Sequence, residues 1–189
     1  ASSIKLPPRP RPESRPLSET EKRAIPKSKF TDREKVFVYI LLYTGLRRGE
    51  ILALSRNDIN TKRHELSVRN AVTFDGNNPI YKDYPKSNAG IRTVPIPKDL
   101  QDVLYPYLNS LQGLYLFEMV RKSGLMTKSS YRKFWDGIRD KINIAAGGTK
   151  DINVVHGLTA HVFRHNYCTM LYYSDVDVKD AQRLMGHSN

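Results

Sequence analysis

The spacing of apolar residues limits the fold of this chain most strongly, because it is helical along most of the sequence and changes once to a strand pattern. Helical spacing is found at residues 32–43, 49–54, 100–104, 134–142, 159–173 and 178–185. Residues 65–96 instead contain short apolar runs separated by the turn sequences DGNN and SNAG. We therefore expect a mixed α/β fold that is mainly α-helical and carries a small three-stranded antiparallel sheet.

Local capping signals predict where the first helices begin and end. Ser18 with Glu21, and Thr31 with Glu34, have the spacing of a capping box. The second helix should end at Gly45, because glycine readily adopts the left-handed conformation that closes a helix. Its buried face is expected to comprise Val36, Phe37, Ile40 and Leu41.

An excess of basic residues indicates a polyanionic partner. The 189 residues contain 31 Lys and Arg against 19 Asp and Glu, a formal net charge of +12. DNA, RNA and an anionic membrane surface all fit this charge. A membrane-spanning helix is not expected, because the longest apolar run, 36–43, falls far short of the roughly 18 residues required. The single cysteine, Cys168, cannot form an internal disulfide, which favours a reducing compartment such as the cytosol.

Residues 1–17 differ in composition from the rest of the chain. They hold five prolines and three arginines, Arg9, Arg11 and Arg15, with too few apolar residues to form a packed core. We interpret residues 1–17 as a basic, proline-rich linker from an N-terminal DNA-binding domain, and residues 18–189 as one folded domain. The arginines of the linker could also contact phosphate groups.

Two short sequence strings carry side chains suited to binding a phosphate. In TAHVFRH, His161 and Arg164 are three residues apart, so they share one face of a helix for which Thr159 is the expected N-cap. The first turn of a helix also favours an anion. In TGLRRGE, Arg47 and Arg48 lie in a tight connection between buried helices, where packing alone gives no reason for a long cation.

The TGLRRGE string leads to three separate expectations. Arg47 should point inward, where a planar guanidinium can bind phosphate through two hydrogen bonds. Arg48 should be solvated. Glu50 either holds a neighbouring backbone group or a catalytic cation, or is an acidic residue that only stabilises a helix start.

Two further residues add to this set. Lys86 precedes the turn at 87–90, at the tip of a hairpin, where a mobile ammonium could protonate a departing alkoxide. His187 follows Gly186, the expected C-cap of the helix at 178–185, and could donate a hydrogen bond to an anion. Each feature alone is common on protein surfaces, so the inference depends on their combination.

The order and context of these strings resemble the tyrosine recombinases, also called the phage-integrase family, over roughly residues 18–189. In that family an arginine in a TGLRxxE string, a hairpin lysine, an HxxR pair and a histidine or tryptophan after Leu-Gly surround the scissile phosphate. The matching positions here are Arg47, Lys86, His161, Arg164 and His187. A small departure is Met185, which stands where the family usually shows leucine.

The resemblance implies a tyrosine-recombinase catalytic domain and an enzyme of site-specific DNA recombination that needs no metal or nucleotide cofactor. A tyrosine would attack the phosphate, a 3′-phosphotyrosyl bond would store the energy of the broken linkage, and a 5′-hydroxyl would reverse the attack. Arg47 and Arg164 would stabilise charge on the non-bridging oxygens. His161 would accept the proton of the tyrosine, Lys86 would protonate the leaving 5′-oxygen, and His187 would donate a hydrogen bond to the phosphate.

The resemblance also implies partners and an origin. The substrate would be double-stranded DNA, bound by a dimer to tetramer of the protein in the cytoplasm, with no membrane involved and with accessory DNA-bending proteins as possible partners. The expected type is a mobile-element integrase, although the residues do not distinguish a phage, a conjugative transposon or a chromosome-resolution system.

The nucleophilic tyrosine is the main departure from the family pattern. In the family it lies on the helix after the Gly-His string, whereas this sequence ends two residues after His187. None of its eleven tyrosines has that position. Tyr167, Tyr172 and Tyr173 are expected to belong to the helix that carries Arg164 and to have a packing role. The 189 residues are therefore expected to bind DNA without cleaving it.

Two other classes of function stay open. A zinc site is one, because His156, His161, His165 and Cys168 lie close together in the sequence, although no paired cysteines accompany them. A non-catalytic DNA-binding regulator is the other, and covalent capture of nicked DNA would distinguish it from an enzyme. Within the enzyme class, type IB topoisomerases and telomere resolvases perform the same chemistry.

Overall fold

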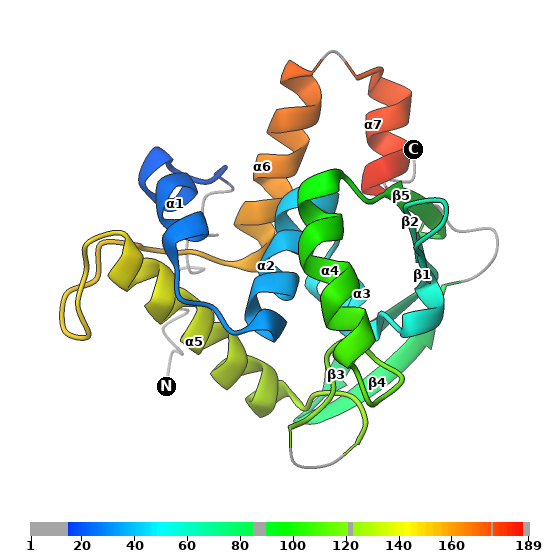
Figure 1. The fold of residues 1–189 in the computed structure, drawn as a ribbon, viewed down its shortest axis with the longest axis horizontal. Helices are drawn as coiled ribbons and strands as arrows, with labels where there is room; N and C mark the ends of the chain where they lie inside the picture. The colour runs from blue at the N-terminus through cyan, green and yellow to red at the C-terminus, as the bar shows by residue number, and fades with distance from the viewer. Residues whose placement is uncertain (1–14, 85–89, 121–122, 175, 187–189) are drawn as a thin grey trace, which may run out of the picture.

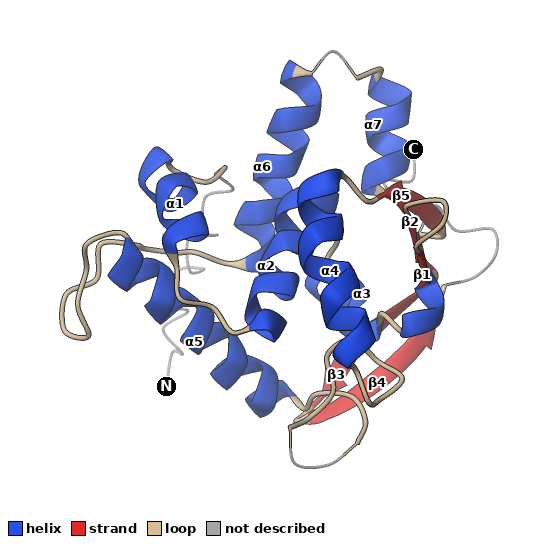
Figure 2. Cartoon of the chain, in the orientation of Figure 1, coloured by secondary structure: helices blue, strands red, loops and turns tan. Residues whose placement is uncertain are grey.

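The computed structural model describes residues 15–84, 90–120, 123–174 and 176–186. Within these ranges the chain forms seven α-helices and five short β-strands, which confirms the expected mainly helical α/β fold (Figure 1, Figure 2). The helices are α1 (Glu19–Ala24), α2 (Asp32–Thr44), α3 (Arg48–Ala53), α4 (Lys98–Ser110), α5 (Lys128–Ala145), α6 (Ala160–Tyr173) and α7 (Val178–Met185). The strands are β1 (Ile59–Asn60), β2 (Glu65–Val68), β3 (Asn70–Asp75), β4 (Asn78–Asp83) and β5 (Arg92–Pro95). Two 3₁₀ turns, η1 (Ile25–Lys27) and η2 (Arg56–Asp58), follow α1 and α3.

The capping signals place the helix ends as predicted. Ser18 and Thr31 each form a full capping box with the glutamate three residues later, so α1 and α2 begin directly after them. α2 ends at Gly45 and α7 at Gly186, with φ values of 60° and 62°. α6 begins after Thr159, as expected, although the side chain of Thr159 makes no capping hydrogen bond.

Helix α2 lies between α4 and α6 in the centre of the helical part (Figure 1). All four residues of its predicted face are buried, and Val38 is buried as well, because neighbours cover this helix on more than one side. The ring of Phe37 meets Phe117 and Phe134 edge to face, with centroids 5.0 and 5.2 Å apart. These contacts join α2 to α5 and to the segment that precedes α5.

Among the described residues the strands form two antiparallel units instead of one sheet. β2 pairs with β1 and β5, and β3 pairs with β4 in a hairpin. The predicted first strand is divided at Arg69, because the residues before it pair with β5 and those after it pair with β4. The turn predicted at 75–78 is confirmed, since Asp75 pairs with Asn78 and Gly76 has φ 54°.

Two contacts fix the β3–β4 hairpin between helices. At its turn, the backbone N–H of Lys128 donates to the Asn77 carbonyl oxygen at 3.1 Å, and the N–H of Ser129 donates to Asn77 Oδ1 at 2.9 Å. At Gly49 of α3, a Cβ atom would lie only 2.6 Å from the carbonyl oxygen of Val72 in β3, so this close approach requires glycine. The hairpin therefore holds α3 and the start of α5 in a fixed relation.

Helices α6 and α7 pack on each other through Tyr167, Leu171 and Met185. The first part of α6 contacts α2, and its end extends beyond α2 (Figure 1). α7 also contacts β5. Searching the described part of the chain for a helix long and apolar enough to cross a membrane finds none.

The described chain already packs against this core at its first residues. Arg15 donates to both carboxylate oxygens of Glu21 and to the carbonyl oxygen of His156, each at 2.7 Å. Leu17 is buried. Packed structure thus reaches three residues before the boundary expected at Ser18, while residues 1–14 of the expected linker lie outside the described ranges.

Candidate active site

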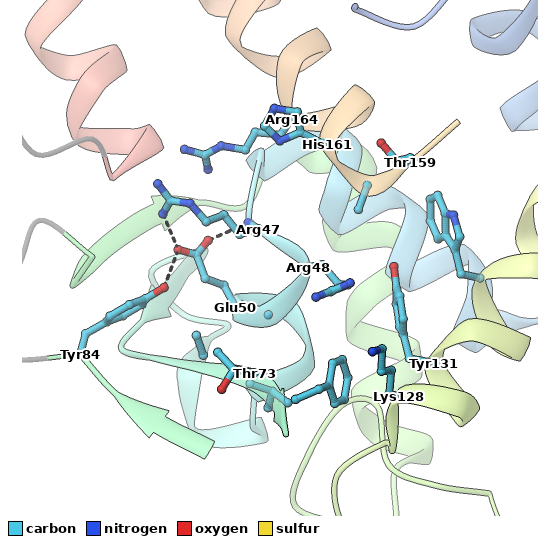
Figure 3. Close-up of a pocket in the computed structure, with 16 residues that line it drawn as sticks. Arg47, Arg48, Glu50, Thr73, Tyr84, Lys128, Tyr131, Thr159, His161 and Arg164 are labelled. Carbon is cyan, nitrogen blue, oxygen red and sulfur yellow. Dashed lines mark hydrogen bonds and ion pairs between the residues drawn. The ribbon is translucent and has the colours of Figure 1, made fainter. Parts of the chain in front are cut away.

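A cleft of about 740 Å³ opens between α3, β3, α5 and the start of α6 (Figure 3). Its ionisable lining residues are Arg47, Arg48, Glu50, Tyr84, Lys128, Tyr131, His161 and Arg164. The fold thus brings three of the predicted site residues, Arg47, His161 and Arg164, to one cleft from distant parts of the sequence.

Glu50 organises the hydrogen bonds beneath this cleft. Its carboxylate is buried and accepts from the guanidinium of Arg92 at 3.0 and 2.8 Å, from the backbone N–H of Arg47 at 2.7 Å, and from the Tyr84 hydroxyl at 3.3 Å. Burial raises the pKa of Glu50, but the bonds from Arg92 and Arg47 outweigh it and hold that pKa below its usual value. Glu50 therefore holds both a backbone group and cations, as the first interpretation of the sequence expected.

Arg47 is the N-cap residue of α3 and keeps part of its side chain in solvent. Its Nη1 donates to Glu50 Oε1 at 3.0 Å, and its Nη2 donates to the carbonyl oxygen of Gly186 at 3.2 Å. The side chain is 43% exposed. The guanidinium is thus oriented by Glu50 and still accessible to a ligand in the cleft.

Arg164, in contrast, is buried at the edge of the cleft. Its Nη1 donates to the carbonyl oxygen of Gly45 at 2.7 Å, and its Nη2 donates to that of Met185 at 2.6 Å. Burial, together with the charge of Arg47, lowers the pKa of Arg164 to about 10, so the group stays charged at neutral pH. Because its bonds join the ends of α2 and α7, the position of this cation is set before any ligand binds.

His161 lies one turn before Arg164 on α6. It is exposed and lines the cleft, as its spacing to Arg164 predicted (Figure 3). An exposed imidazole at this position is accessible to a group entering the cleft.

Lys86 and His187 lie outside the described residues. The residues on either side of the Lys86 segment can be placed. Tyr84, before the segment of Lys86, bonds to Glu50, and the carbonyl oxygen of Gly90, after it, accepts from Arg92 at 3.1 Å.

Comparison with known proteins identifies the family of this chain. The model of the phage integrase family matches residues 18–189. The chain belongs to the phage integrase family. A tyrosine recombinase XerC-like protein of Caldanaerobacter subterraneus subsp. tengcongensis is 29% identical over 196 residues, covering 92% of this chain and 47% of the relative. Tyrosine recombinase XerA of Thermococcus kodakarensis is 30% identical over 159 residues, covering 83% of this chain and 48% of the relative.

A solved structure shares the fold of this family member. The Tn1549 transposon integrase in complex with circular intermediate DNA aligns with a TM-score of 0.78 at 21% identity, covering 95% of this chain and 61% of the other. At that identity the likeness concerns the fold alone. The chain spans about half the length of the curated relatives that it matches.

Two lining or supporting residues of this phage-integrase domain, Arg92 and Lys128, were missed by the sequence reasoning, and the surroundings of a third, Arg48, were predicted only in part. Arg92 is buried beside Glu50, and the only signal for it was alternation in β5, which puts Arg92 on the inward face with Val94. Arg48 is exposed, as expected, but its guanidinium also lies over the rings of Phe74 and Tyr131. Lys128 gave no signal, because it reaches the cleft only through the packing of α5 on the hairpin.

The tyrosines of α6 differ in their environments. Tyr167 packs as expected, with its ring so close to Gly45 that a Cβ there would lie 2.4 Å from it. The expectation of packing is wrong for Tyr172 and Tyr173, which are 76% and 79% exposed because the end of α6 extends beyond the core (Figure 1). Around His161 and Cys168, as elsewhere in the described chain, no three His, Cys, Asp or Glu side chains come together to hold a metal ion.

Proposed function

We propose that this chain is the catalytic domain of an enzyme of site-specific DNA recombination. It would integrate and excise DNA by cleaving and rejoining strands through a 3′-phosphotyrosyl intermediate. The observation that carries the proposal is the convergence of Arg47, His161 and Arg164 on one cleft above buried Glu50. Two positioned guanidinium groups suit a phosphodiester, because its non-bridging oxygens gain charge as the phosphorus is attacked.

Each cleft residue has a role that fits its surroundings. Arg164 and Arg47 bind the non-bridging oxygens, the first as a buried and rigid donor and the second as an accessible one held by Glu50. His161, exposed at the start of α6, accepts the proton of the attacking tyrosine.

Lys86 and His187 complete the proposed site. Lys86 protonates the leaving 5′-oxygen, and His187 donates a hydrogen bond to the phosphate. Support for Lys86 comes from the bonds of Tyr84 and Gly90 to Glu50 and Arg92, which hold both sides of its segment near the cleft.

We infer that the attacking tyrosine is none of those in the described chain. Tyr84 and Tyr131 line the cleft, but burial raises the pKa of both hydroxyls, and the negative charge of Glu50 raises that of Tyr84 further. A raised pKa opposes the loss of the proton that attack requires. Tyr167 is buried against Gly45. Of the eleven tyrosines, all of them within the described residues, only Tyr84 and Tyr131 line the cleft. The 189 residues should therefore bind DNA without forming a covalent bond to it.

The proposed partners are double-stranded DNA and further copies of the chain. The net charge of +12 fits a polyanion, and the Tn1549 integrase is similar in fold and is described in complex with circular intermediate DNA. We also propose that the chain acts as a dimer to tetramer on DNA, with DNA-bending proteins as accessory partners, and that it originates from a mobile element.

Covalent capture tests the proposed function. The protein at its full natural length is incubated with a nicked suicide substrate and separated on a denaturing gel. A recombinase gives a protein–DNA adduct that survives denaturant, whereas a DNA-binding regulator gives binding in a gel shift and no adduct. An adduct formed by residues 1–189 alone would show that one of their own tyrosines attacks.

A further inference from the structure

Arg48 lies on the α5 side of the cleft in a setting unlike that of the other arginines there. Its guanidinium carbon is 5.5 Å from the ring centre of Phe74 and 5.3 Å from that of Tyr131. Figure 3 shows Arg48 turned toward Tyr131 and Lys128 and away from Glu50. The two rings belong to β3 and α5, the elements joined at the β3–β4 turn. A long, flexible side chain is thus held by two fixed rings.

No carboxylate of the described residues forms an ion pair with Arg48. Arg47 and Arg92, by comparison, both bond to Glu50. Aromatic rings contact the faces of a guanidinium, while its N–H donors lie in its plane and stay available at its edge. The rings also limit the rotamer freedom that a free arginine would lose on binding a ligand.

Lys128 provides a second cation at this end of the cleft. It is the first residue of α5 and lines the same cleft as Arg48. The cleft, at about 740 Å³, has room for more than one phosphate group, since on the same measure one water molecule needs only about 10 to 15 Å³. In Figure 3, Arg47 and Arg164 lie toward one end of the cleft and Arg48 and Lys128 toward the other.

We propose that Arg48, held between Phe74 and Tyr131, forms with Lys128 a second anion subsite that binds a backbone phosphate adjoining the one bound by Arg47 and Arg164. Arg48 is then a positioning residue. By fixing the neighbouring phosphate, it determines which phosphodiester of the strand lies at the two catalytic arginines. The subsite rests on the proposed function, because it needs a DNA strand in the cleft.

Titrations of DNA binding against salt concentration measure the proposed contact between Arg48 and a phosphate. Arg48→Gln should lower the slope of log K against log salt by about 0.9, the value for one phosphate contact. If both proteins bind equally at 1 M salt, this slope corresponds to about eightfold weaker binding at 0.1 M. Arg132→Gln is the matched control, because Arg132 is an exposed arginine of α5 that does not line the cleft. An equal change of slope in both variants would overturn the subsite.

Neutral methylphosphonates, placed at one backbone position of the DNA at a time, locate the contact. Next to the scissile phosphate, one such replacement should weaken binding by the wild-type chain and leave Arg48→Gln unaffected. Phe74→Leu keeps apolar volume but removes a ring face, so it should give part of the Arg48→Gln effect at that same position.

The outcomes separate the two proposals. Equal losses for wild type and Arg48→Gln at every position, or a difference confined to the scissile phosphate, would overturn the second subsite while leaving recombination intact. Failure of the wild-type protein to bind DNA at all would overturn the proposed function and the subsite together. Unchanged urea unfolding midpoints show that the variants are folded.

Discussion

Replacing Glu50 with glutamine tests the frame on which the cleft is built. The change keeps the shape of the side chain and removes its charge. Glu50 accepts five hydrogen bonds, three at Oε1 and two at Oε2, from Arg47, Arg92 and Tyr84. Because one oxygen becomes an NH₂ group, at least two of these bonds are lost in either orientation of the amide.

The expected loss in the free energy of unfolding is about 3 to 5 kcal/mol, from two charge-assisted bonds and an uncompensated buried charge on Arg92. Urea unfolding measures it. Asp136→Asn, which breaks the partly exposed pair with Arg139, is the control and should cost less than about 1 kcal/mol.

The same loss should depend on pH in one direction. The pKa of Glu50 is lowered in the folded protein, so its stabilisation is fully present above the unfolded value of about 4.3 and disappears as pH falls through the folded pKa. The difference between wild type and Glu50→Gln should therefore stay constant from pH 7 to about 5 and narrow below about pH 4.3. A Glu50→Gln protein as stable as Asp136→Asn would refute the central role of this carboxylate.

Three other changes test separate parts of the structure. Gly45→Ala should lower the free energy of unfolding, measured in urea, by about 2 kcal/mol or more, and clearly by more than Gly76→Ala does. Both glycines have a similar positive φ, but only a Cβ at position 45 would meet a ring, that of Tyr167. Equal losses in the two variants would show that the Tyr167 contact does not matter. Removing residues 1–14 should lower the slope of log K against log salt for DNA binding by up to about 2.7, if Lys5, Arg9 and Arg11 all contact phosphate. An unchanged slope would mean that this segment is a passive tether. Lys86→Ala should fail to cleave ordinary DNA and recover on a strand with sulfur at the 5′-bridging position, which leaves without a proton donor. Equal impairment on both strands would instead indicate phosphate binding by Lys86.

Features set by neighbouring residues could be predicted from the sequence. The capping box at Thr31, the left-handed Gly45 and the three-residue spacing of His161 and Arg164 depend only on local geometry, and the structure shows all of them. The convergence of Arg47 with this pair followed from family resemblance, since nothing in local spacing brings α3 to α6.

Features set by distant partners could not be predicted. Leu66, Val68, Val72 and Phe74 keep one alternating register on both sides of Arg69 and Asn70, so the pattern does not reveal that the chain changes its pairing partner there. In the sequence, Arg92 looks like an ordinary polar residue of a strand, because its partner Glu50 is brought to it only by the fold. Likewise, the setting of Arg48 arises from two rings that only the folded hairpin and α5 bring together.

The rate of covalent adduct formation by Arg164→Ala tests the proposed role of the cleft most directly. The protein at its full natural length is assayed on a nicked suicide substrate, with a parallel gel shift for DNA affinity. Loss of one preorganised donor should slow adduct formation about 100- to 1000-fold while binding stays largely intact. Near-normal adduct formation by Arg164→Ala would contradict the assignment of this cleft as the site of DNA cleavage.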